Sequence, residues 1–288
     1  MKYRIADGFF SNVVVPMMWI WSNADPSRIS MGLDWTVVGE RAFEALFRGN
    51  SQLVYGRSSD RKLVIAKGVP GAPYADPLRL LTILPGLKPS YWGYVPWARS
   101  DIYVHPSFQA LRNSYAPIVS GEGPLAPSAA MGAAASAAWE RLGLANCPAV
   151  VGVHGRSSVH YAGLEAKSTE HIELMADAAE KALAKLPPGS KIFLATHLDH
   201  FVAYFRIRFR DRLAVNDTAA GRDTDPGSDW NRGANVLQMA RDVFLDALLL
   251  ARCRQVIGGV SNVVLYVACH NPQIPIGIAP HLLGMEGL

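Results

Sequence analysis

The sequence predicts an α/β fold with two halves, each built around a parallel β-sheet. In the C-terminal half, short apolar runs alternate with segments of helical periodicity, and the N-terminal half shows a weaker form of the same alternation. Between them, the proline- and glycine-rich stretch Pro117–Pro127 runs into the alanine-rich stretch Ala126–Ala138, which is typical of a helix. We therefore expect two domains, residues 1–125 and residues 126–288.

The C-terminal half contains the clearest elements. Short apolar runs bounded by turns are typical of buried strands, and we expect strands at Pro148–His154, Lys191–Thr196, Arg212–Val215, Gln255–Val260 and Pro275–Ala279. Helical spacing of apolar residues predicts helices at Ser168–Leu186, His197–Phe209, Ala234–Arg252 and Ser261–His270. This alternation favours right-handed βαβ crossovers and a parallel sheet covered on both faces.

In the N-terminal half, strands are expected at Tyr3–Ile5, Ser30–Trp35 and Lys62–Ala66, with one helix ending near Asn23 and another at Glu40–Arg48. Open α/β sheets bind ligands at the carboxyl ends of their strands. Two such halves, joined in the middle of the chain, place the ligand in the cleft between them.

Composition and charge argue against several classes of protein. Of the 288 residues, 50% are hydrophobic and 18% are charged, which is not the composition of a disordered chain. The net charge of +4 is too small to indicate nucleic-acid binding, and it fits a protein that holds an anionic small molecule. The sequence does not indicate an oligomeric state.

Cysteine usage and hydropathy indicate the expected compartment. The three cysteines, Cys147, Cys253 and Cys269, form no CxxC pair, which argues against a disulfide scaffold or a zinc ribbon. The apolar run Val13–Trp21 contains Pro16 and is shorter than the roughly 20 residues of a membrane-spanning helix. No signal pattern opens the chain, so we expect a cytoplasmic protein without a membrane span.

A histidine and an arginine end the first expected strand of the C-terminal half. His154 and Arg156 lie two residues apart, so on an extended chain their side chains point to the same side. A guanidinium is a fixed fork of donors that suits a phosphate. The alternative is structural, with Arg156 in an ion pair and His154 packed in the core.

Two glycine-containing turns also follow expected strands. Gly258–Asn262 predicts a tight turn and a helix that starts at Ser261, and helix starts bind anions through their free amides and their dipole. The alternative is a simple N-cap. Gly8–Asn12 is either a second anion-binding turn of this kind or an ordinary turn between a strand and a helix.

One carboxylate lies on the apolar stripe of an expected helix. Asp246 shares this stripe with Met239, Val243 and Leu250, and a buried carboxylate is costly unless it is paired. Its partner is either part of the protein, such as an arginine or backbone N–H groups, or the two adjacent N–H donors of a guanine edge. The sequence leaves both open.

Together, these segments resemble the fucosyltransferase superfamily, which includes bacterial nodulation fucosyltransferases, α-1,6-fucosyltransferases and protein O-fucosyltransferases. The order and spacing of the matching pieces fit over nearly the whole length. The pieces are GFFSN (Gly8–Asn12), VGVHGR (Val151–Arg156), KIFLAT (Lys191–Thr196), DVFLDALLLARC (Asp242–Cys253) and GGVSNVVLYVACHNP (Gly258–Pro272).

The resemblance implies a GT-B-like fold, in which two Rossmann-type halves with parallel sheets face each other across a cleft. It implies an inverting, metal-independent transfer of a sugar, usually fucose, from a GDP-sugar to a glycan or another hydroxyl acceptor, with no prosthetic group. The residues that it assigns are Arg156 for the β-phosphate, His154 for the nucleotide, Asp246 for guanine, Ser261 and Asn262 for the diphosphate, and Gly8, Phe9 and Asn12 for the other half of the cleft.

The chain departs from the family pattern at two acidic positions. Val159 stands where relatives have an aspartate after the His-x-Arg segment, and His197 stands where relatives often show Ala-Thr-Asp. Glu165 is the nearest candidate base, and His160 could take the place of the missing group because histidine titrates near neutrality. The expected catalytic residues are therefore Arg156, Glu165 and His160.

Two other interpretations stay open. Loss of the two carboxylates also fits a diverged relative that binds a nucleotide sugar or a glycan with weak or no transfer activity. The chain could also be an α/β enzyme unrelated to this family, and binding of GDP separates that interpretation from the other two.

Overall fold

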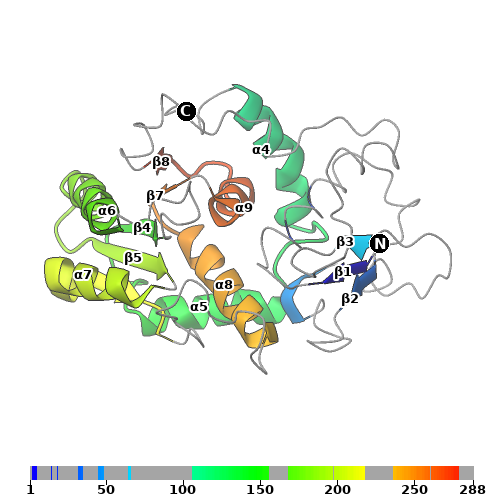
Figure 1. The fold of residues 1–288 in the computed structure, drawn as a ribbon, viewed down its shortest axis with the longest axis horizontal. Coiled ribbons are helices and arrows are strands. Elements are labelled where there is room, and N and C mark those ends of the chain that lie inside the picture. Colours follow the sequence, from blue (N-terminus) through cyan, green and yellow to red (C-terminus); the bar gives the residue numbers. More distant parts are fainter. Residues whose placement is uncertain are drawn as a thin grey trace.

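The structure is a computed structural model of the 288-residue chain. It describes residues 2–4, 14, 18, 32–34, 45–48, 64–65, 106–155, 168–196, 198–217, 236–259 and 261–278. The larger of the two sheets in this part of the chain is a five-stranded parallel sheet with helices on both faces (Figure 1).

The strand order of this sheet places a switch point in its middle. Its strands are β4 (Val150–Gly155), β5 (Lys191–Thr196), β6 (Leu213–Val215), β7 (Gln255–Gly258) and β8 (Ile276–Ile278). They lie in the order β6-β5-β4-β7-β8, so the chain builds outward from β4 in one direction and from β7 in the other. Ligands of open α/β sheets bind at the carboxyl ends of the strands where the order reverses, which here is between β4 and β7.

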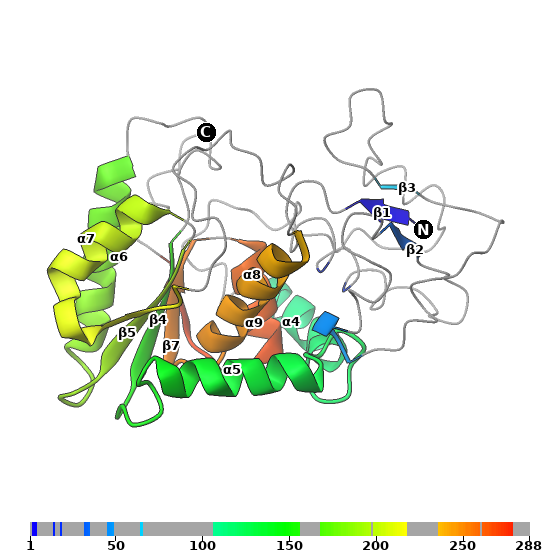
Figure 2. The ribbon, with the colours of Figure 1, turned by 90° about the horizontal axis from the view of Figure 1, so that it is seen from below.

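Helices cover both faces of the sheet (Figure 2). One face packs against α6 (Ser168–Leu183) and α7 (Asp199–Phe209), and a short 3₁₀ turn, η7 (Arg210–Arg212), leads from α7 into β6. The other face packs against α5 (Ala129–Arg141), α8 (Val236–Leu250) and α9 (Asn262–His270). Among the described residues, no helix has both the length and the apolar character needed to cross a bilayer.

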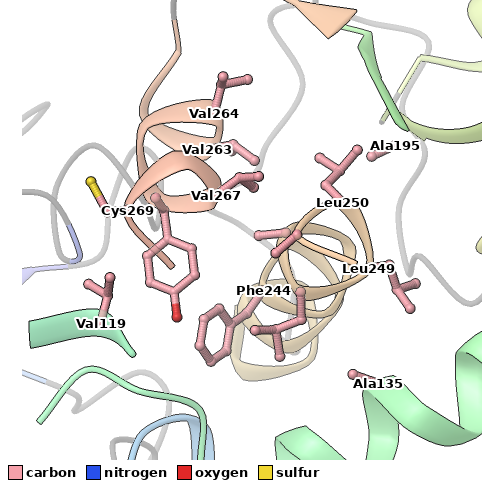
Figure 3. Packing of buried hydrophobic residues seen from close by; sticks show 14 of the residues in the cluster. Val119, Ala135, Ala195, Phe244, Leu249, Leu250, Val263, Val264, Val267 and Cys269 are labelled. Atoms are coloured by element: carbon pink, nitrogen blue, oxygen red, sulfur yellow. The ribbon is translucent and has the colours of Figure 1, made fainter. Parts of the chain in front are cut away.

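Aromatic and branched side chains fill the core on the α8–α9 face. The ring of Phe244 lies 5.0 Å from the ring of Phe47 and 5.5 Å from that of Tyr266, measured between centroids. Figure 3 shows Val263 and Val267 of α9 on the side of that helix that faces α8. Burial of each large apolar side chain contributes about 1.5–3 kcal/mol, so this cluster fixes how α9 lies against α8.

The strands and helices expected in the C-terminal half are confirmed, with small differences at their ends. The alanine-rich stretch forms α5, and Ser128 caps it by accepting a hydrogen bond from the amide of Met131 at 3.2 Å. Helix α4 (Pro106–Val119) was not expected, because proline usually marks a turn or a loop. Pro106 fits the first helical turn, where no amide donor is needed, and Pro117 lies in the last turn.

The N-terminal part has a parallel sheet of its own. The strands β1 (Lys2–Arg4), β2 (Gly32–Asp34) and β3 (Val64–Ile65) overlap the three expected strands, and they lie in the order β2-β1-β3. Most of the two helices expected here lies outside the described residues. The α/β class with parallel sheets is confirmed, while the domain boundary at residue 125 and the cleft between two halves stay predictions.

Candidate functional site

The carboxyl ends of β4 and β7 bring together two of the residues expected to bind the donor. His154 of β4 lies in register with Gly258, the last residue of β7. Ser261 follows β7, and its Oγ lies 3.5 Å from Nδ1 of His154. Both side chains lie at the switch point of the sheet, which makes this strand end a candidate binding site.

Ser261 is the N-cap of α9. Its backbone is extended (φ −148°, ψ 155°), and its Oγ accepts a hydrogen bond from the amide of Val264 at 3.1 Å. The hydroxyl keeps its own proton, and it can donate this proton to an anion when Nδ1 of His154, 3.5 Å away, carries a proton of its own. The start of α9 therefore offers that proton, free backbone amides and the positive end of the helix dipole, which together suit an anion.

Two glycines allow close packing around this site. A Cβ on Gly258 would lie 3.1 Å from Cγ2 of Val264 and 3.4 Å from Cβ of His154. A Cβ on Gly155 would lie 2.7 Å from Cδ1 of Phe201 in α7. Glycine at these positions lets the first turn of α9 approach the strand ends from one face while the Phe201 ring closes the other.

Several predicted site residues lie outside the part of the chain that the structure describes. These are Gly8, Phe9, Asn12, Arg156, His160 and Glu165, together with the two departures from the family pattern, Val159 and His197. Asn262 is the first residue of α9, and its side chain is also outside the described part. Of the predicted set, the structure brings His154 and Ser261 together, and the roles of the others stay predictions.

Asp246 has a partner within the protein. Nδ2 of Asn216 donates a hydrogen bond to Oδ1 of Asp246 at 3.2 Å, and Nη2 of Arg141 donates to Oδ1 of Asn216 at 3.1 Å. This polar chain joins α5, the end of β6 and α8, and it offsets the cost of partly burying the carboxylate. The structure thus identifies Asn216 as a partner of Asp246 within the protein. Contact between Asp246 and a guanine edge stays a prediction.

Two polar residues at strand ends escaped the sequence analysis. Asn216 follows β6 and is buried, and Thr196 ends β5, where its Oγ1 accepts a hydrogen bond from the amide of Leu198 at 3.2 Å. Thr196 lies in register with Gly155, so it borders the candidate site. In the sequence, each of them is visible only as a single polar residue at the end of an apolar run.

The described part of the candidate site presents donors that suit an anion. Within the described ranges, no three histidine, cysteine, aspartate or glutamate residues are grouped so that they could hold a metal ion. What His154 and Ser261 offer is an imidazole nitrogen and a hydroxyl, next to the amides at the start of α9.

No family model matches this chain, and no curated protein matches it. Solved structures do match. NodZ α-1,6-fucosyltransferase co-crystallised with GDP is 17% identical with a TM-score of 0.49, and the match covers 92% of this chain and 90% of that one. The same enzyme soaked with GDP-fucose is 17% identical with a TM-score of 0.47, covering 95% and 92%. Fucosyltransferase NodZ from Bradyrhizobium is 17% identical with a TM-score of 0.49, covering 92% and 90%.

Proposed function

We propose that this protein is a GDP-sugar-dependent glycosyltransferase that transfers a sugar, with fucose as the first candidate, to a glycan or another hydroxyl acceptor. Transfer proceeds with inversion and without a metal ion. The donor class follows from the sequence segments that resemble fucosyltransferases, above all Val151–Arg156. The observation that supports the proposal most is the contact between Ser261 and His154 at the switch point of the sheet.

This contact supports a diphosphate site because of what adjoins it. β4 passes from His154 to Gly155, and the next residue in the sequence is Arg156. An anion at the start of α9 therefore lies beside the strand end that leads to a guanidinium. Two adjacent phosphates need several donors at once, and the Ser261 hydroxyl, the helix amides and Arg156 can supply them.

In the proposed reaction, an acceptor hydroxyl attacks the anomeric carbon from the face opposite the phosphate. The bond from that carbon to the β-phosphate oxygen breaks, and GDP leaves with the bonding electron pair. Arg156 and the start of α9 stabilise the negative charge that develops on the leaving diphosphate. The proton of the acceptor passes to Glu165 or His160, the two candidate bases.

Binding without transfer is the second candidate function. It is favoured by Val159 and His197, which stand where relatives carry acidic residues. A chain that keeps Ser261 and Arg156 but lacks an effective base would hold a nucleotide sugar without turning it over. Slow hydrolysis of GDP-fucose without acceptor supports the transferase, and tight GDP binding with no hydrolysis supports the binder.

Replacing Ser261 by alanine should weaken GDP binding about tenfold, because the diphosphate loses a hydroxyl donor and α9 loses its cap. Calorimetric titration with GDP measures the change. Ser128 provides a matched control, since it caps α5 in the same way, with its Oγ accepting from the amide of Met131 at 3.2 Å.

Loss of either cap should lower the free energy of unfolding by about 1 kcal/mol. Ser128→Ala also removes the hydrogen bond that Oγ donates to the carbonyl oxygen of Ala45 at 3.0 Å, so it should lower stability at least as much as Ser261→Ala while it keeps the GDP affinity of the wild type. Wild-type GDP affinity in Ser261→Ala, or an equal loss in both variants, would contradict a diphosphate site at the start of α9.

A further inference from the structure

A buried arginine holds the end of α9 that lies opposite the candidate site. Nε of Arg112, in α4, donates to the carbonyl oxygen of Ala268 at 2.7 Å. Its Nη2 donates to the carbonyl oxygens of Asn271 at 3.0 Å and Ile274 at 3.2 Å. One guanidinium thus satisfies three acceptors in the last turn of α9 and in the segment that leads to β8, a place where helix carbonyls have no partner within the helix.

Burying the guanidinium of Arg112 costs free energy, because the charged group loses its contact with water. Arg112 is 7% exposed, and burial lowers the pKa of its guanidinium from the ordinary value. A buried cation is unfavourable unless its hydrogen bonds and its charge are matched. Three carbonyl oxygens and the negative end of the α9 dipole provide that match, so the guanidinium and the helix end hold each other.

α9 is short and closely packed, so fixing its C-terminal end also fixes the position of its Ser261 end at the candidate site. It has nine residues, which corresponds to a length of about 13 Å. All residues from Val263 to Cys269 are buried, and the helix packs against both α4 and α8. Figure 3 shows Val263 and Val267 on its α8 side. Asn271 adds a second tie, because its Nδ2 donates to the carbonyl oxygen of Ala251, just after α8, at 2.8 Å. Because close-packed interiors transmit strain, we expect α9 to shift at its Ser261 end when its other end is released.

We propose that Arg112 is a positioning residue of the diphosphate site. By binding the C-terminal carbonyls of α9, it sets where the Ser261 end of that helix meets His154. The inference rests on the proposed function, because this position matters only if the start of α9 binds the donor. It also makes α4, which belongs to the predicted N-terminal domain, part of the support for donor binding.

Arg112→Lys tests this role, because lysine keeps the charge but cannot present a planar fork to three carbonyls. We expect this variant to bind GDP about tenfold more weakly than the wild type, since the charge-assisted contacts at the Ser261 end are displaced. Guanosine, which has no phosphate, should bind the variant as it binds the wild type. Calorimetry with GDP and competition with guanosine measure the two affinities.

Arg208→Lys is the matched control on the opposite face of the sheet. Nη2 of Arg208, in α7, donates to Asp177 and Glu180 of α6, both at 2.5 Å, so this arginine also joins two helices. Because these ion pairs are partly exposed, the control should change stability little in chemical denaturation and keep the GDP affinity of the wild type. If the role of Arg112 is purely structural, Arg112→Lys should keep the GDP affinity of the wild type, as Arg208→Lys does.

The outcomes separate this inference from the proposed function. If Arg112→Lys binds GDP as the wild type does, or loses GDP and guanosine affinity equally, the positioning role is wrong and the proposed function stands. If the wild type binds no GDP, both are wrong. A tenfold loss confined to GDP supports both.

A measurement on the wild type does not depend on the stability of any variant. The solvent exchange of the Arg112 Nε–H can be followed by NMR with and without GDP. Linkage requires that a contact which strengthens GDP binding be strengthened by GDP in turn. Slower exchange in the presence of GDP supports the positioning role, and unchanged exchange contradicts it.

Discussion

Replacing Arg156 by alanine should weaken GDP binding about 10- to 100-fold. A hydrogen bond to a charged group contributes about 1.5–3 kcal/mol, and about 1.4 kcal/mol corresponds to a tenfold change in affinity. Arg156 follows Gly155 at the carboxyl end of β4, next to the contact between His154 and Ser261. Its planar fork suits the phosphate that the fucosyltransferase resemblance assigns to it. Calorimetric titration with GDP measures the loss.

Two further variants make this loss interpretable. Arg156→Lys keeps the charge without the fork and should recover part of the affinity. Arg206→Ala removes an exposed arginine whose Nη2 lies 3.0 Å from Oδ1 of Asp217, and it should leave GDP binding unchanged. If Arg156→Ala binds GDP with wild-type affinity, or loses guanosine affinity to the same extent, the phosphate role of Arg156 is wrong.

Replacing Gly155 by alanine should reduce both stability and GDP affinity. The added Cβ would lie 2.7 Å from Cδ1 and 3.0 Å from Cε1 of Phe201, and 3.2 Å from Cβ of Thr196. Overpacking of this kind costs about 1–3 kcal/mol, and Phe201 is itself buried and unable to turn aside freely. The strand end that must shift is the one that leads to Arg156. Chemical denaturation and GDP titration measure the two effects.

The chain offers a rescue and a control for this variant. Phe201→Leu in the Gly155→Ala background removes the ring atoms that clash and should restore part of the lost stability. Gly132 lies in α5 with no atom within 4 Å of an added Cβ, so Gly132→Ala should raise the free energy of unfolding by about 0.5–1 kcal/mol. Wild-type stability and GDP affinity in Gly155→Ala would contradict the close packing of this strand end.

Local patterns explain what could be predicted of the fold. The alanine-rich stretch and Ser128 predict α5, and the apolar run from Val150 to Val153 predicts β4. α4 lacked such a pattern, because it begins at Pro106 and contains Pro117. Packing against α9 stabilises this helix, and its residues Tyr115 and Val119 are fully buried. No local sequence pattern reveals this contact.

The same distinction holds for the candidate site. Ser261 could be predicted, because a glycine-rich turn and the apolar helix that follows are adjacent in the sequence. The partner of Asp246, Asn216, is 30 residues away, and the three carbonyls bound by Arg112 are 156, 159 and 162 residues away. Hydrogen bonds over such separations leave no periodicity or motif, so only the fold shows them.

The most direct test of the diphosphate site is a crystal structure of this protein with GDP bound. The account predicts the diphosphate at the carboxyl ends of β4 and β7, with phosphate oxygens about 3 Å from Oγ of Ser261, from the first amides of α9 and from the guanidinium of Arg156. GDP bound elsewhere on the chain, or an Arg156 guanidinium directed away from the start of α9, would contradict it.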